Sequence, residues 1–309
     1  MKFLVTGGAG FIGSHIAEEL LRRQHQVRIL DNFSTGKREN LTFAASTAEL
    51  EVIEGDIRAA ETVDRAAHGV EGIFHEAALV SVPATIENPR LSFEVNAGGT
   101  FNVLEAARHG KVRRVVYASS AAVYGDSTVL PLAETVPPRP LSPYGLDKLY
   151  GEQMGTLWHS LYGQQMIALR YFNVFGPRQD PASPYSGVIS IFVNLLRAGR
   201  SPTIFGDGEQ TRDFVYVRDV VNANLRAMFA GPAGFHVFNV GGGRETSLNQ
   251  LLSELQQLTG TSIKPGYVKA RDGDIRHSLA DISLIRRELG YAPGGTLTEG
   301  LRLLLDSVL

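Results

Sequence analysis

The stretch Thr6-Gly7-Gly8-Ala9-Gly10-Phe11-Ile12-Gly13 joins a short apolar run, Lys2–Thr6, to an amphipathic run, Ile12–Arg23. A strand, a glycine-rich turn and a helix in this order are typical of a dinucleotide-binding unit. The first, third and fourth glycines permit the tight turn, let backbone amides approach a pyrophosphate, and bring the helix against the strand. The N-terminus of the helix then presents its positive end to the phosphates.

The same alternation of strand and helix continues through the first half of the chain. It predicts an α/β fold, a Rossmann-type doubly wound parallel sheet with helices on both faces. Further strands are predicted at Val27–Leu30, Leu50–Ile53, Gly72–His75 and Val115–Ala118, and further helices at Ala59–His68, Pro89–His109 and from Ser142-Pro143 to about Tyr162.

The pattern becomes shorter and more irregular after Met166–Tyr171, which predicts a second, smaller α/β lobe. We therefore expect a dinucleotide-binding domain over residues 1–171 and a substrate-binding domain over residues 172–309. Segment 213–240 is expected to return partly to the first domain, through apolar runs at Asp213–Val217 and Phe235–Val240. Helices covering the smaller lobe are predicted at Leu248–Leu258, Ile282–Leu289 and Leu297–Val308.

Composition argues against several classes of partner. The 30 Lys and Arg against 32 Asp and Glu leave a net charge of -2, so there is no concentrated basic surface for nucleic acid or an anionic membrane. No apolar run reaches the roughly 18 residues of a membrane span, and no signal peptide is recognisable. There are no cysteines, and the eight histidines lack the spacing of metal ligands. We expect a cytoplasmic enzyme without a metal site.

An acidic residue sets the expected choice of dinucleotide. Asp31 ends the second predicted strand, 18 residues after the last glycine of the turn. A carboxylate there accepts hydrogen bonds from ribose hydroxyls and repels a 2′-phosphate, which favours NAD over NADP. The nearby Arg28, Lys37 and Arg38 argue the other way. Asp56-Ile57, past the third strand, either flanks the adenine or caps the next helix.

Three residues later in the chain have the chemistry of a proton relay. Tyr144 and Lys148 share one face of the helix that begins at Ser142, because they are four residues apart. A lysine ammonium and the positive nicotinamide ring are expected to lower the pKa of the phenol, which is ordinarily near 10. Ser119-Ser120 directly follows the fifth strand, at the sheet edge where such folds bind ligands, and a serine there can share the moving proton.

Together these residues resemble the extended short-chain dehydrogenase/reductase family, and within it the nucleotide-sugar 4-epimerases. The motifs that carry the likeness are Gly7–Gly13, Asp31, His75-Glu76-Ala77-Ala78, Asn96, Ser119–Gly125, Tyr144–Lys148 and Arg170–Gly176. The resemblance implies an enzyme that keeps NAD bound, with Ser120, Tyr144 and Lys148 as catalytic residues. Tyr144 would take the O4 proton of a UDP-hexose while the C4 hydride moves to the nicotinamide. The 4-keto sugar would turn over and take the hydride back on its other face.

The resemblance also implies two sets of contacts. The residues expected to hold NAD are Gly7, Gly10, Phe11, Ile12, Gly13, Asp31, Asn32, Asp56, Ile57, Ala77, Ala78, Asn96, Tyr144, Lys148 and Tyr171. Those expected to hold the UDP-sugar are Ser119, Ser120, Tyr144, Asn173, Gly187, Val188, Phe205, Arg212, Arg271, Asp274 and Ser278. Two arginines suit a diphosphate because each offers a planar fork of donors. Some epimerases carry a lysine where this chain has Val80, so one cofactor contact is missing.

The sugar itself is left open. Ser278 stands where glucose- and galactose-restricted epimerases tend to carry tyrosine, and a small residue leaves room for an acetamido group. The segments Arg178–Pro181, Thr246–Leu251 and Gly273–Asp281 look particularly like UDP-N-acetylglucosamine 4-epimerases. UDP-GlcNAc/UDP-GalNAc and UDP-glucose/UDP-galactose both remain candidate substrates, because a small residue admits a larger substrate without excluding a smaller one.

Other activities on this scaffold are weighed by the residues after the serine. Dehydratases and decarboxylases of the family carry an acid there, whereas this chain has Ser120-Ala121-Ala122-Val123-Tyr124, so both are disfavoured. A UDP-glucuronate 4-epimerase or a 4-reductase remains an alternative. A non-enzymatic dinucleotide sensor would have no use for the relay.

A homodimer is expected through helices Pro89–His109 and Pro143–Tyr162, as in similar enzymes. Leu104, Leu149, Trp158 and Leu161 serve either that interface or the core of one subunit.

Overall fold

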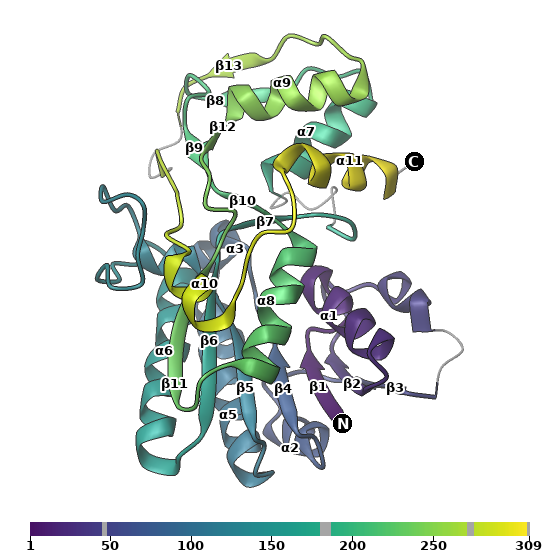
Figure 1. Cartoon of the computed structure of the whole chain (residues 1–309), viewed down its shortest axis with the longest axis vertical. Helices are drawn as coiled ribbons and strands as arrows, with labels where there is room; N and C mark the ends of the chain where they lie inside the picture. The colour runs from purple at the N-terminus through teal and green to yellow at the C-terminus, as the bar shows by residue number, and fades with distance from the viewer. Residues whose placement is uncertain (45–47, 180–186, 271–274, 308–309) are drawn as a thin grey trace.

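The computed structural model describes residues 1–44, 48–179, 187–270 and 275–307. Its centre is a seven-stranded parallel sheet with the order β11-β6-β5-β4-β1-β2-β3 (Figure 1). The chain therefore has the predicted Rossmann-type sheet. Its strands are β1 Lys2–Thr6, β2 Gln26–Asp31, β3 Leu50–Glu54, β4 Gly72–His75, β5 Arg114–Ser120, β6 Gln165–Tyr171 and β11 Phe235–Val240.

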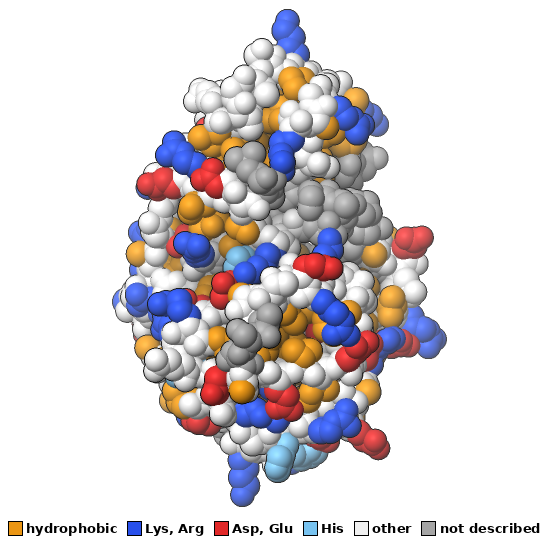
Figure 2. Space-filling model, turned by 90° about the vertical axis from the view of Figure 1, so that its right-hand side faces the viewer, with side chains coloured by type: hydrophobic (Ala, Val, Ile, Leu, Met, Phe, Trp, Pro, Cys, Tyr) orange, Lys and Arg blue, Asp and Glu red, His pale blue; other side chains and the backbone are white. Residues whose placement is uncertain are grey.

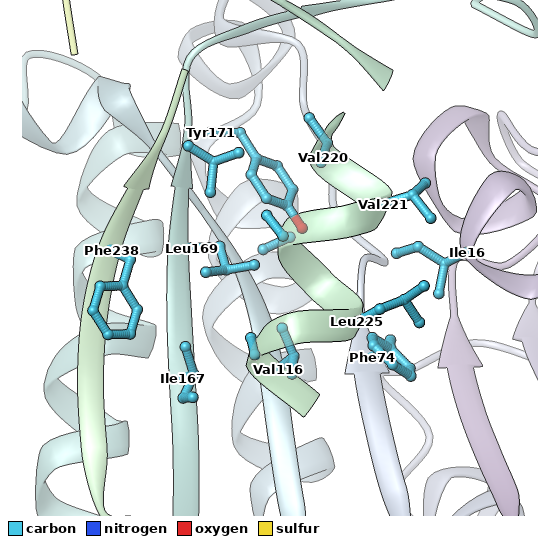
Figure 3. Close-up of a cluster of buried hydrophobic side chains, with 14 of the residues drawn as sticks. Ile16, Phe74, Val116, Ile167, Leu169, Tyr171, Val220, Val221, Leu225 and Phe238 are labelled. Carbon is cyan, nitrogen blue, oxygen red and sulfur yellow. The ribbon is translucent and has the colours of Figure 1, made fainter. Parts of the chain in front are cut away.

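Two groups of helices cover the two faces of this sheet. Helices α1 (Phe11–Arg22) and α8 (Val217–Ala230) pack on one face, and α2 (Ala60–Ala67), α5 (Gly99–His109) and α6 (Pro143–Tyr162) pack on the other. Figure 3 shows the core on the α8 side, where side chains of the helix meet alternate residues of the strands. Alternation places every second strand residue on the same face, so the two cores have separate sets of residues.

Helix α6 is bounded by the signals that its sequence carries. The Ser142 hydroxyl accepts a hydrogen bond from the backbone amide of Gly145, Pro143 occupies the first helical position, and Gly163 ends the helix in the left-handed conformation. The helix start is fixed by these caps, which sets where Tyr144 and Lys148 emerge.

The predicted helix Pro89–His109 is not continuous. Helix α4 (Pro89–Ser92) passes into a wider π-helical segment, Phe93–Gly98, before α5 begins. The Asn96 side chain in that segment bonds both to the amide and to the carbonyl of Leu79, at 2.8 and 3.1 Å. π-Helical turns often place a functional residue, and here the turn anchors the loop after β4. Helix α3 (Val82–Glu87) follows that loop.

The smaller lobe packs around its own core. Helices α7 (Val188–Arg197), α9 (Leu248–Thr259) and α11 (Leu297–Ser307) share a cluster of leucines, isoleucines and phenylalanines. Short strand pairs complete the lobe: β7 Asn173–Phe175 with β10 Phe214–Tyr216, β8 Thr203–Phe205 with β13 Gly266–Val268, and β9 Thr211–Arg212 with β12 Thr246–Ser247.

Two assignments in the second half are corrected. The run Asp213–Val217 was expected in the main sheet, but β10 pairs with β7 instead, and only β11 and α8 return to the larger layer. The helix predicted at Ile282–Leu289 was expected on the smaller lobe. It forms α10 (Ser283–Leu289), whose Ile285 and Leu289 are buried in the core beneath α8 and β11. Periodicity shows that a helix has an apolar face, not which layer that face meets.

Candidate active site

The glycine-rich turn has the close packing that its sequence predicts. Gly7 has a φ of +67°, and a Cβ there would lie 2.7 Å from the backbone nitrogen of Ala77. A Cβ on Gly13 would collide with the Gly7 carbonyl oxygen. Gly10 is the N-cap residue of α1 and has no side chain to cap the helix. The backbone amides of the first turn are therefore left for a hydrogen-bond acceptor on a ligand. The turn therefore fits a pyrophosphate.

Asp31 lies beside this turn at the end of β2. Its carboxylate accepts hydrogen bonds from the amides of Ala9, at 2.9 Å, and Phe33, at 2.8 Å. The two arginines that argued for NADP are already engaged. Arg28 pairs with Glu51 and donates to backbone carbonyls of 66 and 68, and Arg38 pairs with Glu54. A carboxylate with committed arginines around it suits ribose hydroxyls better than a 2′-phosphate.

The residues expected around the adenine adjoin one another. Asn32 Nδ2 donates to Asp56 Oδ2 at 3.0 Å, and the Arg58 side chain beside Asp56 lowers the pKa of that carboxyl to about 2. Asp56 caps no helix, because α2 begins after Ala59. This excludes the alternative that Asp56 caps the next helix. The Ile57 side chain is buried against Gly99 of α5, so any contact it makes with a ligand must come from the backbone.

The relay residues come together at the carboxyl edge of the sheet. Ser120 ends β5 and Tyr144 lies at the start of α6, and the Ser120 side chain favours ionisation of the Tyr144 phenol, which lowers its pKa. Lys148 Nζ donates to the carbonyl oxygen of Ala118 at 2.6 Å and lies 5.7 Å from the centroid of the Tyr144 ring. Lys148 is 3% exposed, whereas Tyr144 and Ser120 keep part of their surface accessible. Tyr144 and Ser120, unlike Lys148, are thus partly accessible.

The electrostatics differ from the sequence-based expectation in one respect. Burial raises the pKa of Tyr144 to about 12, the Ser120 side chain opposes the rise, and the Glu76 carboxylate adds to it. Burial also lowers the pKa of Lys148 to about 8, opposed by the charges of Glu76 and Asp147. The net shift of the phenol pKa is thus upward in the protein without its cofactor, whereas the expected lowering depended on the nicotinamide charge as well as on Lys148.

Ser119 does not join this group. Its hydroxyl donates to Glu152 Oε1 at 2.6 Å, and Glu152 forms a buried ion pair with Arg170 at 2.6 Å. Successive strand residues point to opposite faces, so when Ser120 faces the relay, Ser119 faces the body of α6. The predicted substrate contact through the Ser119 side chain is not supported.

Two expected cofactor residues have structural partners. Asn96 is 2% exposed, and its side chain holds the backbone of Leu79, so it shapes the loop that carries Ala77 and Ala78. Tyr171 donates to Glu76 Oε1 at 2.9 Å and accepts from Asn224 Nδ2 at 2.7 Å. Both lie next to the site, and neither side chain points freely into it.

The expected substrate residues belong to several elements of the smaller lobe. Asn173 begins β7, Gly187 and Val188 start α7, Phe205 ends β8, Arg212 ends β9, and Ser278 is 8% exposed in the segment before α10. Arg271 and Asp274 lie outside the described residues.

A buried carboxylate that the sequence analysis missed connects two of the segments that carry the expected substrate residues. Asp213, beside Arg212, is fully buried and accepts hydrogen bonds from the amides of Gly242, Gly243 and Ala280 at 2.6, 3.0 and 3.0 Å. It thereby ties the strand of Arg212 to the segment of Ser278. No local pattern announces these partners, which are 29 to 67 residues away.

On the face in Figure 2, acidic and basic side chains are interspersed. Among the residues that the structure describes, no group of His, Asp and Glu is arranged to hold a metal ion, and no helix has the length and apolar character of a membrane span.

Comparison with known proteins agrees with this geometry. Residues 3–241 match the model of the NAD dependent epimerase/dehydratase family. The chain is 41% identical over 304 residues to UDP-glucose 4-epimerase of Mycolicibacterium smegmatis, covering 97% of this chain and 96% of the relative.

Two solved structures are similar over their whole length. UDP-N-acetylglucosamine 4-epimerase from Methanobrevibacter ruminantium M1, in complex with UDP-N-acetylmuramic acid, matches with a TM-score of 0.95 at 37% identity, covering 99% of this chain and 97% of that one. UDP-glucose 4-epimerase from Thermotoga maritima, with UDP-glucose, matches with a TM-score of 0.94 at 39% identity, covering 100% and 98%.

Proposed function

The chain belongs to the NAD dependent epimerase/dehydratase family, and on this basis we propose that it is a UDP-hexose 4-epimerase. The observation that carries the proposal is the meeting of Ser120, Tyr144 and Lys148 at the sheet edge beside the glycine-rich turn. A protein that only senses a dinucleotide needs the turn but not the relay.

When bound, NAD⁺ would supply the acceptor for the C4 hydride. The protein's part is to move the O4 proton. Tyr144 is partly accessible, so it takes that proton, and the neighbouring Ser120 hydroxyl shares it. The 2.6 Å bond to Ala118 holds the Lys148 ammonium beneath the phenol, where its charge favours the ionised form. Because burial keeps the pKa of Tyr144 high, the positive charge of the oxidised cofactor is needed to complete the activation.

Two pairs of substrates fit the proposal. Ser278 supports UDP-GlcNAc/UDP-GalNAc, since a small side chain leaves space for an acetamido group, and UDP-glucose/UDP-galactose is compatible with the same space. UDP-glucuronate 4-epimerisation is the second candidate, together with other nucleotide-sugar oxidoreductions. Dehydration is disfavoured, because Ala121, Ala122 and the buried Val123 follow Ser120 and none can move a proton.

We further propose that residues 1–171, with α8 and β11, hold NAD, and that the remainder of 172–309 holds the UDP-sugar. A homodimer through α5 and α6 is also proposed. Of the four side chains that could serve either the dimer interface or the core of one subunit, three belong to the core. Leu104 and Trp158 are buried within the subunit, and Leu149 packs against its core. Leu161 is 59% exposed on α6, near the exposed Leu157 and Tyr162, and supports an interface.

The test of the function is incubation with UDP-GlcNAc, UDP-glucose and UDP-glucuronate in separate reactions, without added NAD. An epimerase returns its hydride, so we expect the C4 epimer to accumulate without net consumption of cofactor. Conversion of UDP-glucuronate alone would favour the second candidate. Absence of any epimer, with NAD supplied as well, would refute the proposal.

A further inference from the structure

Glu76 is a carboxyl group beside the relay to which the proposed reaction assigns no task. It follows directly after β4. Tyr171 donates to its Oε1 at 2.9 Å, and Asn224 of α8 donates to the Tyr171 hydroxyl at 2.7 Å. A chain of hydrogen bonds therefore runs from α8 over the end of β6 to the end of β4.

These hydrogen bonds lie on the same face of the sheet as Ser120. Ser120 and Tyr171 are directly opposite each other in the β5–β6 register. Val116, four residues before Ser120, and Phe74, two before Glu76, point into the core in which the Tyr171 ring is also seen (Figure 3). Strand residues two apart share a face of the sheet. The Ser120 hydroxyl, the Tyr171 phenol and the Glu76 carboxyl therefore meet at one edge of it.

The charge of Glu76 also acts on the two titratable residues of the relay, Tyr144 and Lys148. Its negative charge disfavours the phenolate of Tyr144 and favours the ammonium of Lys148. Burial raises the pKa of Glu76 to about 7, opposed by the Tyr171 hydrogen bond and by Lys148. The carboxyl thus changes charge near neutral pH.

We infer that Glu76 is a positioning residue of an electrostatic kind: through its charge it sets the pH range in which Tyr144 can act as a base. The inference rests on the proposed function for its catalytic meaning. An ionised Glu76 keeps Tyr144 protonated and Lys148 charged, whereas a neutral Glu76 removes that restraint on the phenol.

The other titratable groups of this cluster are held in one charge state or have partners of their own. His75 is held neutral, because burial lowers its pKa to about 3, and burial raises the pKa values of the Tyr117 and Tyr171 phenols. Asp147 interacts with Lys148 and is bonded to Ser92. Glu76 is therefore the group whose charge is expected to change closest to neutrality.

The test is an absorbance titration of the Tyr144 phenolate in Glu76→Gln. The chain has ten tyrosines, so the titration of a matched Tyr144→Phe protein is subtracted from each curve. The subtraction cancels the absorbance of the other nine tyrosines and leaves the signal of Tyr144. Gln retains an oxygen for the Tyr171 hydroxyl but carries no charge. We expect the midpoint of Tyr144 to fall by about one pH unit. An unchanged midpoint would overturn the inference.

Tyr171→Phe is the matched control, because it deletes the hydrogen bond to Glu76 and leaves the charge of the carboxyl. Its Tyr144 midpoint is expected to stay close to that of the wild type, and an equal fall in both variants would assign the effect to packing. If Glu76→Gln does not fold, carbon-13 NMR can follow Glu76 itself. Its midpoint must be higher in Lys148→Met than in wild type, and equal midpoints would overturn the inference.

These titrations need no turnover, so they remain decisive whether or not the epimerase assay succeeds. With an active enzyme, both limbs of the kcat/KM profile in Glu76→Gln should shift to lower pH, because loss of the carboxylate eases ionisation of Tyr144 and deprotonation of Lys148 alike. A purely structural defect would lower the profile without moving it.

Discussion

Lys148 donates a 2.6 Å hydrogen bond from its ammonium group to the carbonyl oxygen of Ala118. This contact joins α6 to β5 one turn below Tyr144 and two residues before Ser120. It fixes the position of the Lys148 ammonium relative to the Tyr144 phenol, although the lysine side chain is long and flexible. The relay is therefore organised by the backbone of the sheet.

Lys148→Met should lose this contact and the charge while keeping most of the volume. We expect kcat to fall by about a hundredfold or more, since both the orientation and the activation of the phenol suffer. Steady-state kinetics would measure it, with the exposed Lys264→Met as the matched control. Near-normal kcat in Lys148→Met would show that the ammonium is not needed.

Ser278→Tyr should change substrate preference. Ser278 is 8% exposed, so a tyrosine there has to occupy the space proposed for the acetamido group. We expect kcat/KM for UDP-GlcNAc to fall by about tenfold or more relative to UDP-glucose, and Ser278→Ala to preserve the ratio. An equal loss with both substrates would mean that residue 278 does not contact the sugar.

Glu152→Gln should destabilise the fold. It would leave the Arg170 guanidinium buried without its carboxylate and weaken the bond from Ser119. The free energy of unfolding is expected to fall by about 3–5 kcal/mol in denaturant titrations. Glu288→Gln, which removes the exposed partner of Arg287, is the control and should have no measurable effect. Equal stability of the two variants would contradict the role given to the buried pair.

Leu161→Glu should dissociate the proposed dimer. The side chain is 59% exposed in one subunit, and a carboxylate at an apolar interface is costly to desolvate. Sedimentation velocity should show a shift towards monomer, whereas Leu303→Glu, at a similarly exposed leucine on α11, should leave the assembly intact. A wild-type protein that sediments as a monomer would exclude the dimer itself.

Local patterns were sufficient for the parts of the site that are close in sequence. The glycine turn, Asp31 at the end of β2 and the Tyr144–Lys148 pair each depend on spacings within one element or one turn. The Rossmann-type architecture followed from the alternation of strands and helices. These features are encoded where they occur.

Features that depend on distant partners were missed. The expected role of Ser119 failed because its partner Glu152 lies 33 positions further along the chain, and the Arg170 that pairs with Glu152 lies 18 positions beyond that. The partner of Glu76 is 95 residues away, and Glu76 drew no hypothesis although its motif was noticed. Helix α10 was assigned to the wrong layer for the same reason. A sequence shows that a buried polar group needs a hydrogen-bond partner and that an apolar helix face needs a packing partner, but it does not show which residues those partners are.

The central claim is that Tyr144 is the base, and Tyr144→Phe tests it most directly, because it deletes the hydroxyl and keeps the ring. The measurement is the rate of C4 epimer formation by this variant, with NAD binding checked separately to show that the fold is intact. We predict a fall of at least about a hundredfold with the cofactor still bound. A rate equal to that of the wild type would contradict the proposed mechanism.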